Sequence, residues 1–284
     1  MLTPAQLAAY LDRVGHSGPV AADEATLVAI HHAHVTTIPY ENLDIQLGRP
    51  LSLAPEALVA KLVTARRGGF CYEQNGLLAL ALRTIGFEVT MVAGAVERAV
   101  RGDDAWSNHM PLLADVDGRR WLVDVGLGDG FLDPLPLEEG EHADGLWKHS
   151  LTRIEGGLWR CFPDPRGSVP SFDFGEEPCE LADFAGACVR QSTSPDSSFV
   201  KTLVVQRPLD HAKTTIRGAA YAESGPDGKT GPELLATAGE WALTLSRRFG
   251  LDLPASEVEV LYPKAREQYE RWRAEKAIVA VEGP

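Results

Sequence analysis

The hydrophobic pattern of this 284-residue chain changes from helical to strand-like at Phe87. Before that residue, apolar side chains recur at helical spacing. After it, the run 87–92 alternates between apolar and polar residues, as a half-buried strand does. A chain that begins with helices, continues with strands and ends with a mixture of both is expected to fold as an α+β protein of two or three parts.

Local signals predict where the individual elements lie. Cap residues at Thr3 and Asp23 begin two helices, and Gly86 and Gly250 end two others. Besides the two capped helices, four stretches have helical spacing, including the two that end at Gly86 and Gly250: 57–63, 71–85, 232–249 and 263–277. Strands are expected over 87–92, 109–116, 120–125, 145–162 and 199–217, the second and third joined as a hairpin by Asp117-Gly118. Segments rich in turn residues predict loops at 39–43, 126–140, 163–178 and 224–232.

Composition narrows the classes of function. The formal net charge of −13 disfavours nucleic acid and anionic membranes as partners. No apolar run is long enough to span a bilayer, and residues 1–15 do not resemble a signal peptide, so a cytoplasmic location is expected. The cysteines lack CxxC spacing and are expected to be free thiols: Cys71, Cys161, Cys179 and Cys188.

The segment from Arg66 to Gly76 carries the first chemical signal. Gly68 and Gly69 allow a tight turn just before a predicted helix, which places Cys71 at or near its N-terminus. Unpaired amides and the helix dipole favour a thiolate there, and Arg66 and Arg67 add positive charge. Cys71 is therefore a candidate nucleophile; the alternative is an inert cysteine packed behind the start of a helix.

A base and a carboxylate follow on the predicted hairpin. His109 opens the first strand, where a histidine taken alone is more often a surface or capping residue. Asp124 lies in an otherwise apolar strand, and burial of a lone carboxylate is costly, so it should have a partner. Pairing of the two strands brings Asp124 near His109, where it can hold the imidazole in one tautomer, as in a catalytic triad.

Together these stretches resemble the arylamine N-acetyltransferase family. The similarity covers roughly residues 25–135 and rests on five motifs in combination: His31-His32-Ala33-His34, the run from Ile38 to Asp44, the run from Arg67 to Asn75, the predicted strand that begins at His109, and Val123-Asp124-Val125-Gly126. The last hundred residues carry no motif that can be matched individually.

The resemblance implies a fold of three domains. These are a helical domain that carries the nucleophile (1–86), a β-barrel-like domain that carries the histidine and aspartate (87–198), and a lid-like α/β domain (199–284). It also implies a papain-like triad where the first two domains meet.

The resemblance further implies the reaction and the roles of site residues. Acetyl-CoA is the expected donor, without a metal, and an arylamine, hydrazine or N-hydroxyarylamine is the expected acceptor. Cys71 is the implied nucleophile, His109 the base and acid, and Asp124 the residue that orients it. Glu41, Arg67 and Asn75 are implied as structural supports, and Asn108 and Gly128 as contacts of coenzyme A.

Other functions stay open on the sequence. Leu127 stands where the family often has an aromatic residue, which leaves room for an amide synthase that transfers a longer or carrier-bound acyl chain. A thiol protease, a transglutaminase-like enzyme and a non-catalytic binding module are the remaining alternatives. The histidines at 31, 32 and 34 suggest a metal site, but no further ligands stand at a recognisable spacing.

Overall fold

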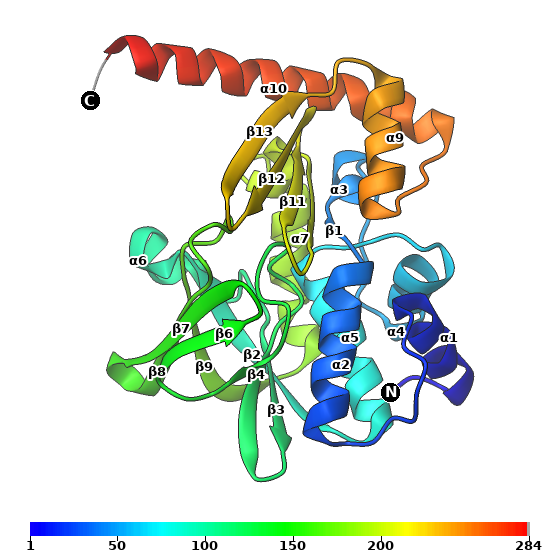
Figure 1. The fold of residues 1–284 in the computed structure, drawn as a ribbon, viewed down its shortest axis with the longest axis vertical. Coiled ribbons are helices and arrows are strands. Elements are labelled where there is room, and N and C mark those ends of the chain that lie inside the picture. Colours follow the sequence, from blue (N-terminus) through cyan, green and yellow to red (C-terminus); the bar gives the residue numbers. More distant parts are fainter. Residues whose placement is uncertain (283–284) are drawn as a thin grey trace.

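Residues 1–282 are described by the computed structural model, with side chains described as far as Lys276. Helices form one side of the lower half of the molecule (Figure 1). Thr3 and Asp23 cap the first two helices as predicted, each by accepting a backbone N–H in the first turn. The helical elements that precede the first long strand are α1 (Pro4–Val14), α2 (Glu24–Thr37), α3 (Leu43–Gln46), which lies higher beside the second sheet, α4 (Pro55–Leu58), the π-helical stretch η1 (Val59–Thr64) and α5 (Cys71–Ile85).

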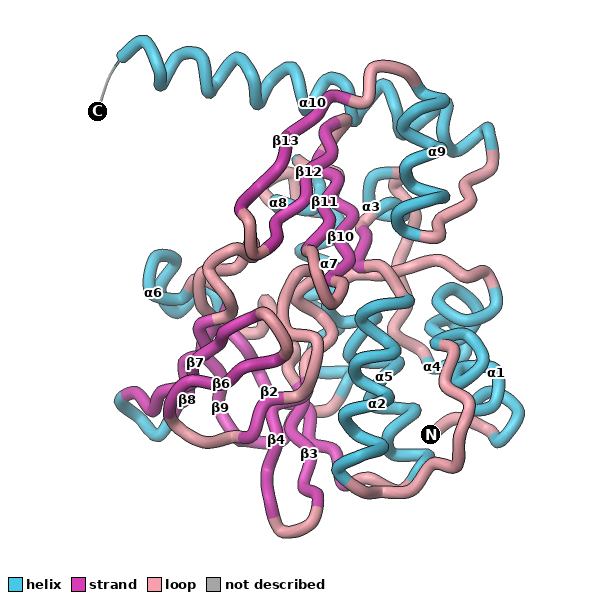
Figure 2. Tube along the Cα trace, viewed as in Figure 1, coloured by secondary structure: helices cyan, strands magenta, loops and turns pink. Residues whose placement is uncertain are grey.

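An eight-stranded antiparallel sheet packs beside these helices and curls into an almost closed barrel (Figure 2). Its order is β5-β4-β3-β2-β9-β8-β7-β6. The strands are β2 (Glu88–Val96), β3 (Leu112–Val116), β4 (Arg119–Val123), β5 (Leu135–Pro136), β6 (Gly140–Asp144), β7 (Trp147–Ile154), β8 (Leu158–Phe162) and β9 (Phe172–Cys179). Short helices α6 (Arg98–Arg101) and η2 (Gly102–Ala105) follow β2, and η3 (Glu155–Gly157) precedes β8. The hairpin predicted about Asp117-Gly118 is confirmed, because Val116 pairs with Arg119 across it.

A second, five-stranded sheet has the order β1-β10-β11-β12-β13. Its first strand, β1 (Tyr40–Glu41), comes from the helical part; the others are β10 (Val204–Pro208), β11 (Lys213–Arg217), β12 (Ala220–Gly225) and β13 (Gly228–Leu234). The elements η4 (Leu181–Phe184), α7 (Ala185–Thr193) and α8 (Ser198–Lys201) connect the two sheets, and α9 (Ala238–Phe249) and α10 (Ala255–Glu282) follow the second. Much of α10 projects beyond the sheet (Figure 1).

Three hydrophobic clusters hold these elements together. The largest joins the N-terminal helices to β2–β4, the second lies between the five-stranded sheet and α9 and α10, and the third fills the barrel. The mixed α+β class is therefore confirmed. The division at residues 86 and 198 stays a prediction, and the pairing of β1 with β10 crosses it.

Four segments predicted as loops contain strands, and two of them contain long ones. The segment 163–178 contains most of β9, which pairs with β2 and β8 and buries Phe172 and Phe174 in the barrel. Its glycine and proline hid the alternation. The segment 224–232 spans the hairpin of β12 and β13, whose second strand is almost wholly exposed and so has no apolar face to reveal it. The segment 126–140 contains the short β5, and 39–43 contains β1.

Several predicted helix limits were also wrong. The helix expected from residue 232 begins at Ala238, because β13 continues to Leu234 and Thr237 forms a capping box with Glu240. The helix expected from 263 begins at Ala255 and contains Pro263 in its interior. A proline is typical of a first helical turn, and that preference misplaced the start.

Candidate active site

Cys71 is the first residue of α5, as the sequence predicts. Close packing of the preceding turn explains the glycine pair: a Cβ on Gly68 would lie 2.0 Å from the carbonyl oxygen of Pro39. The Gly69 carbonyl accepts the Glu41 N–H at 3.0 Å. This approach holds the turn against the strand beside it and fixes where the helix, and therefore the thiol, begins.

The structure brings His109 and Asp124 together. His109 Nε2 lies 2.6 Å from Asp124 Oδ2, and both residues are buried. Strand β3 begins only at Leu112, so His109 is not part of it as predicted; it is held to β2 by a hydrogen bond from the Gly94 N–H to the His109 carbonyl. Because the carboxylate only accepts, Nε2 carries the ring proton and Nδ1 keeps its lone pair.

Asn75, one turn along α5 from Cys71, fixes the carboxylate of Asp124. Its Nδ2 donates to Asp124 Oδ1 at 2.8 Å and to the Met110 carbonyl at 2.8 Å, and its Oδ1 accepts the Val125 N–H. The Gly126 N–H donates to the same carboxylate oxygen at 2.9 Å. The carboxylate therefore has three donors, and the nucleophile helix is tied directly to the hairpin.

Cys71 and His109 line one cavity of about 510 Å³, together with Tyr40, Asn108 and Leu127. Among the described residues, the hydrogen-bond contact of the thiol is with the Asn108 carbonyl, at 4.0 Å, rather than with the His109 ring. Burial raises the pKa of Cys71 well above that of an ordinary thiol. The helix start therefore does not ionise Cys71 by itself, and a proton acceptor in the cavity is required.

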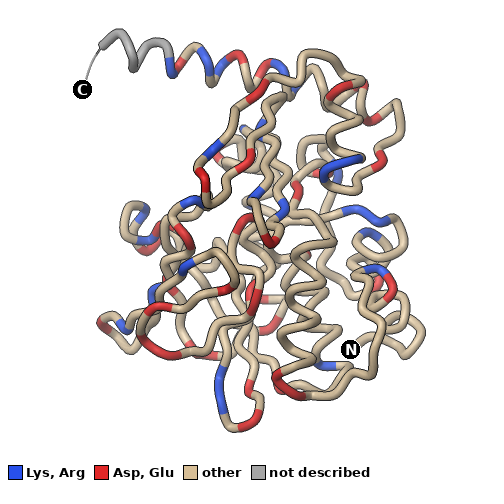
Figure 3. The backbone as a smooth tube through the Cα atoms, viewed as in Figure 1, with Lys and Arg blue, Asp and Glu red and all other residues tan. Residues whose placement is uncertain are grey.

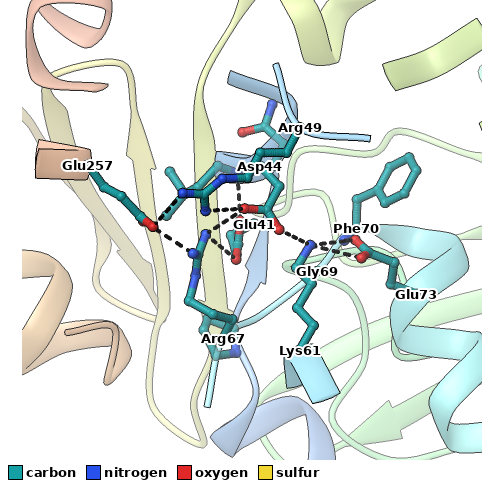
Figure 4. A network of polar contacts seen from close by, with 12 residues as sticks. Glu41, Asp44, Arg49, Lys61, Arg67, Gly69, Phe70, Glu73 and Glu257 are labelled. Carbon is teal, nitrogen blue, oxygen red and sulfur yellow. Dashed lines mark hydrogen bonds and ion pairs between the residues drawn. The ribbon is translucent and has the colours of Figure 1, made fainter. Parts of the chain in front are cut away.

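Arg67, expected to add positive charge near the thiol, is instead engaged by carboxylates (Figure 4). Its guanidinium lies 3.2 Å from Glu41, 3.5 Å from Asp44 and 3.3 Å from Glu257 of α10. The expectation that Arg67 favours a thiolate is wrong, because these three acidic groups screen its charge. The contacts with Glu41 and Glu257 give it a structural position between β1 and α10.

Lys61 extends the same network to the nucleophile helix (Figure 4). Its Nζ lies 3.0 Å from Asp44 and 2.8 Å from Glu73, whose other oxygen accepts the Phe70 N–H. Glu73 is 2% exposed, so its charge depends on this partner. The network therefore fixes the first turn of α5 through Glu73, which binds both Lys61 and the main chain of Phe70.

Of the two residues expected to contact coenzyme A, Asn108 uses its side chain within the protein, and Gly128 lies in a close turn. The Asn108 side chain exchanges hydrogen bonds with the main chain of Val96, at 2.8 and 3.1 Å. Gly128 has φ +76°, and a Cβ there would lie 2.4 Å from Gln206 Oε1, so a glycine is required. Of the two, only Asn108 lines the cavity of Cys71.

A larger cavity of about 1280 Å³ adjoins the first and shares four lining residues with it: Ser168, Thr202, Gln206 and Arg217. Among the charged residues of its lining, the basic ones are in excess: Arg166, Lys201, Lys213, Arg217, Lys229, Lys264, Arg271 and Lys276. Within residues 1–276, three acidic residues also line it: Asp129, Glu267 and Glu275. The excess of basic residues is thus confined to the lining of this cavity, since blue and red segments alternate along α10 (Figure 3) and the net charge of the chain is −13.

The sequence pattern missed the residues that join the two cavities. Gln206 and Arg217 lie on β10 and β11, far along the chain from Cys71, and no spacing relates them to it. Gln191, on the unpredicted helix α7, donates to the Asn108 carbonyl and to Tyr72 Oη, both at 2.7 Å. The basic residues of β10 and β11 were the signal that could have pointed to this region, but composition alone does not show that these strands lie near Cys71.

The structure also bears on the histidines that suggested a metal site and on the search for a membrane span. Within residues 1–276, no group of three or more His, Cys, Asp or Glu side chains is arranged to hold a metal ion. His34 is buried and hydrogen-bonded to Tyr10 and Gln74. No helix in the described part of the chain is both long and apolar enough to cross a membrane.

Comparison with known proteins identifies the family. The sequence model of an N-acetyltransferase family matches residues 23–258. The arylamine N-acetyltransferase of Mycolicibacterium smegmatis is 38% identical over 267 residues, which cover 87% of this chain and 92% of that protein. This chain belongs to the arylamine N-acetyltransferase family. The family resemblance drawn from the sequence motifs is therefore confirmed, and the chain is an acyltransferase.

Solved structures of the family share the fold. An arylamine N-acetyltransferase from Salmonella typhimurium superposes with a TM-score of 0.83 at 27% identity, covering 94% of this chain and all (100%) of that one. The Mycobacterium marinum arylamine N-acetyltransferase, solved in complex with CoA, gives a TM-score of 0.81 at 30% identity, covering 91% of this chain and 98% of that one.

Proposed function

We propose that this enzyme moves an acetyl group from acetyl-CoA to an arylamine, hydrazine or N-hydroxyarylamine through a thioester on Cys71. The observation that carries the proposal is the buried His109–Asp124 pair, which lines the same cavity as the thiol at the start of α5. Nucleophile, base and orienting carboxylate are the parts that covalent acyl transfer requires.

The first half-reaction acylates the enzyme. His109 Nδ1 takes the proton of Cys71, whose pKa is otherwise raised by burial. The sulfur then attacks the acetyl carbonyl carbon, a new C–S bond forms, and the bond to the coenzyme A sulfur breaks. The leaving thiolate takes the proton from His109, so atoms and charge balance. One thioester replaces another, and the intermediate is close in energy to the donor.

The second half-reaction releases the product. The acceptor nitrogen, or the oxygen of an N-hydroxyarylamine, attacks the acetyl carbon and loses its proton to His109. The bond to Cys71 breaks, and the sulfur recovers that proton. Asp124 keeps Nε2 protonated throughout, so Nδ1 is available to accept in each half-reaction.

Three features support a coenzyme A thioester as the donor. The basic cavity shares four lining residues with the cavity of Cys71 and suits the phosphates of a nucleotide carrier. Asn108 lines the reaction cavity, and Gly128 lies against Gln206, which lines both cavities. The relative from Mycobacterium marinum was solved in complex with CoA.

Initial rates with acetyl-CoA and an arylamine test the proposal. A ping-pong mechanism gives parallel lines in double-reciprocal plots, whereas direct transfer in a ternary complex gives intersecting lines. Acyl-CoA thioesters of increasing chain length belong in the same experiment. Turnover that rises with chain length, or that needs a carrier protein, would favour an amide synthase, and peptide hydrolysis would favour a protease.

Arg217→Ala tests the route of the donor. Arg217 lines both cavities, so its loss should raise KM for acetyl-CoA severalfold and leave turnover of p-nitrophenyl acetate, which has no phosphate, nearly unchanged. Arg119→Ala, in the β3–β4 hairpin, is the matched control because Arg119 pairs with Glu138 at the surface. Equal effects on both donors would contradict a phosphate-binding role for Arg217.

A further inference from the structure

The main-chain N–H of Asp124 lacks a strand partner. Pairing of β3 with β4 ends at Leu112 and Val123, and the next residue before Leu112 is Pro111. Asp124 is 1% exposed, and a buried N–H without an acceptor is costly. The acceptor is a side chain from another element: Nε2 of His31, on α2, lies 3.3 Å from the Asp124 nitrogen.

The other ring nitrogen of His31 fixes its tautomer. Nδ1 lies 2.7 Å from the Leu132 carbonyl oxygen, which can only accept, so Nδ1 carries the proton. Nε2 is then left with the lone pair that the Asp124 N–H needs. The ring is fully buried and stacks on Phe131 at 6.4 Å between centroids.

Burial, rather than the charges around it, leaves the His31 ring neutral. Burial lowers the pKa of His31 and outweighs the opposing influence of the Leu132 hydrogen bond and of the nearby carboxylates: Asp133, Asp124 and Asp144. A protonated ring would present a second N–H to the N–H of Asp124. The neutral form is therefore the one that the hydrogen-bond pattern requires.

His31 also joins the two ends of the loop that borders the reaction cavity. That loop leaves β4 at Asp124, passes Gly126 and Leu127 at the cavity, and reaches Leu132. One imidazole accepts from the residue at its start and donates to the residue at its end. Loss of either hydrogen bond would shift the main chain at Asp124, and with it the carboxylate that points toward His109.

We propose that His31 is a positioning residue of the triad: its neutral ring holds the main chain of Asp124 and so aims that carboxylate at His109. The inference rests on the proposed function, because it concerns the orientation of the proposed triad. It does not place His31 in contact with substrate.

The experiment compares His31→Leu, which removes the acceptor, with His31→Gln, whose amide oxygen can replace Nε2. The readout is the pH dependence of Cys71 alkylation by iodoacetamide. In His31→Leu the midpoint should rise by about one pH unit, which is a tenfold slower reaction at pH values below both midpoints. In His31→Gln the alkylation midpoint should stay within about 0.3 pH units of the wild-type value, which is at most a twofold change in rate.

His34→Leu is the matched control. It removes a second fully buried imidazole from the same helix, and the hydrogen bonds of His34 go to Tyr10 and Gln74 rather than to Asp124. It should lower the temperature of unfolding without moving the alkylation midpoint. If His31→Leu also lowers only the unfolding temperature, His31 is a packing residue and the inference is overturned.

Nitrogen-15 NMR of the wild-type imidazoles gives an answer even if His31→Leu does not fold. A neutral ring protonated at Nδ1 is expected for His31, and a charged ring or the Nε2–H tautomer would overturn the inference. Failure of the proposed function is distinguishable: because burial raises the pKa of Cys71, the wild-type thiol would then react only at or above the ordinary thiol pKa of about 8.5, with no change in His109→Ala. An activated wild-type thiol with an unshifted His31→Leu midpoint would refute the role of His31 alone.

Discussion

Replacement of Asp124 by asparagine should nearly abolish acylation, because the site leaves the new amide only one orientation. Asp124 Oδ1 accepts from the Asn75 amide and from the Gly126 N–H, both of which can only donate in that geometry. The oxygen of the introduced amide must therefore occupy that position. Its NH₂ group then faces His109 Nε2, where the carboxylate oxygen lay at 2.6 Å.

An NH₂ group at that position reverses the tautomer of His109. Nε2 must accept, so the ring proton moves to Nδ1, and Nδ1 no longer accepts the proton of Cys71. The same reversal in the serine-protease triad lowers kcat about 10⁴-fold. At about 1.36 kcal/mol for each factor of ten, the expected loss is about 5 kcal/mol of transition-state stabilisation.

The assay is a single-turnover measurement of Cys71 acylation by p-nitrophenyl acetate, with thermal unfolding as a check on folding. Asp173→Asn is the matched control, since Asp173 is an equally buried carboxylate of the barrel that pairs with Arg160 and Arg98. Its acylation rate should stay close to wild type. Acylation by the Asp124→Asn variant within tenfold of wild type would refute the tautomer argument.

Two further substitutions test the supports of the site. Gly126→Ala should cost about 1–3 kcal/mol of folding stability and slow acetyl transfer at least tenfold, because its Cβ would lie 2.7 Å from Asn75 Nδ2. Thermal melts and rate assays measure the two effects. In the same assays the control Gly239→Ala, whose Cβ would meet only Thr237 Oγ1 at 3.9 Å, should be neutral or slightly stabilising. Lys61→Met should cost about 3–5 kcal/mol by leaving the buried Glu73 unpaired, measured by urea unfolding. Adding Glu73→Gln should recover part of that loss, and no recovery would mean that the pair is not what stabilises the turn.

Local signals predicted the elements that carry the proposed triad. The glycine pair followed by Cys71, the cap at Asp23 and the Asp117-Gly118 turn act within a few residues, so the starts of α5 and α2 and the β3–β4 hairpin follow from sequence alone. The carboxylate next to an apolar run correctly predicted a partner for Asp124, because an unpaired carboxylate is costly to bury wherever it lies, although β4 ends at Val123 and Asp124 follows the strand rather than lying in it.

Long-range packing decided what the sequence could not. Strand β9 forms because Phe172 and Phe174 fill the barrel, although its glycine and proline are typical of a loop. No spacing reveals the partner of Arg67, because Glu257, which binds it, is 190 positions away along the chain. The sequence therefore predicted that the charge of Arg67 stabilises the Cys71 thiolate, whereas in the structure Arg67 pairs with Glu41 of β1 and Glu257 of α10.

The central claim is that Cys71 carries the acetyl group between donor and acceptor. Mass spectrometry of the intact enzyme after brief incubation with acetyl-CoA, without an amine, tests it directly. One acetyl group should appear, map to the peptide that contains Cys71, be absent from the Cys71→Ser variant, and disappear when an arylamine is added. An unmodified enzyme that still acetylates the amine, or an acetyl group on another residue that turns over at the same rate, would contradict the account.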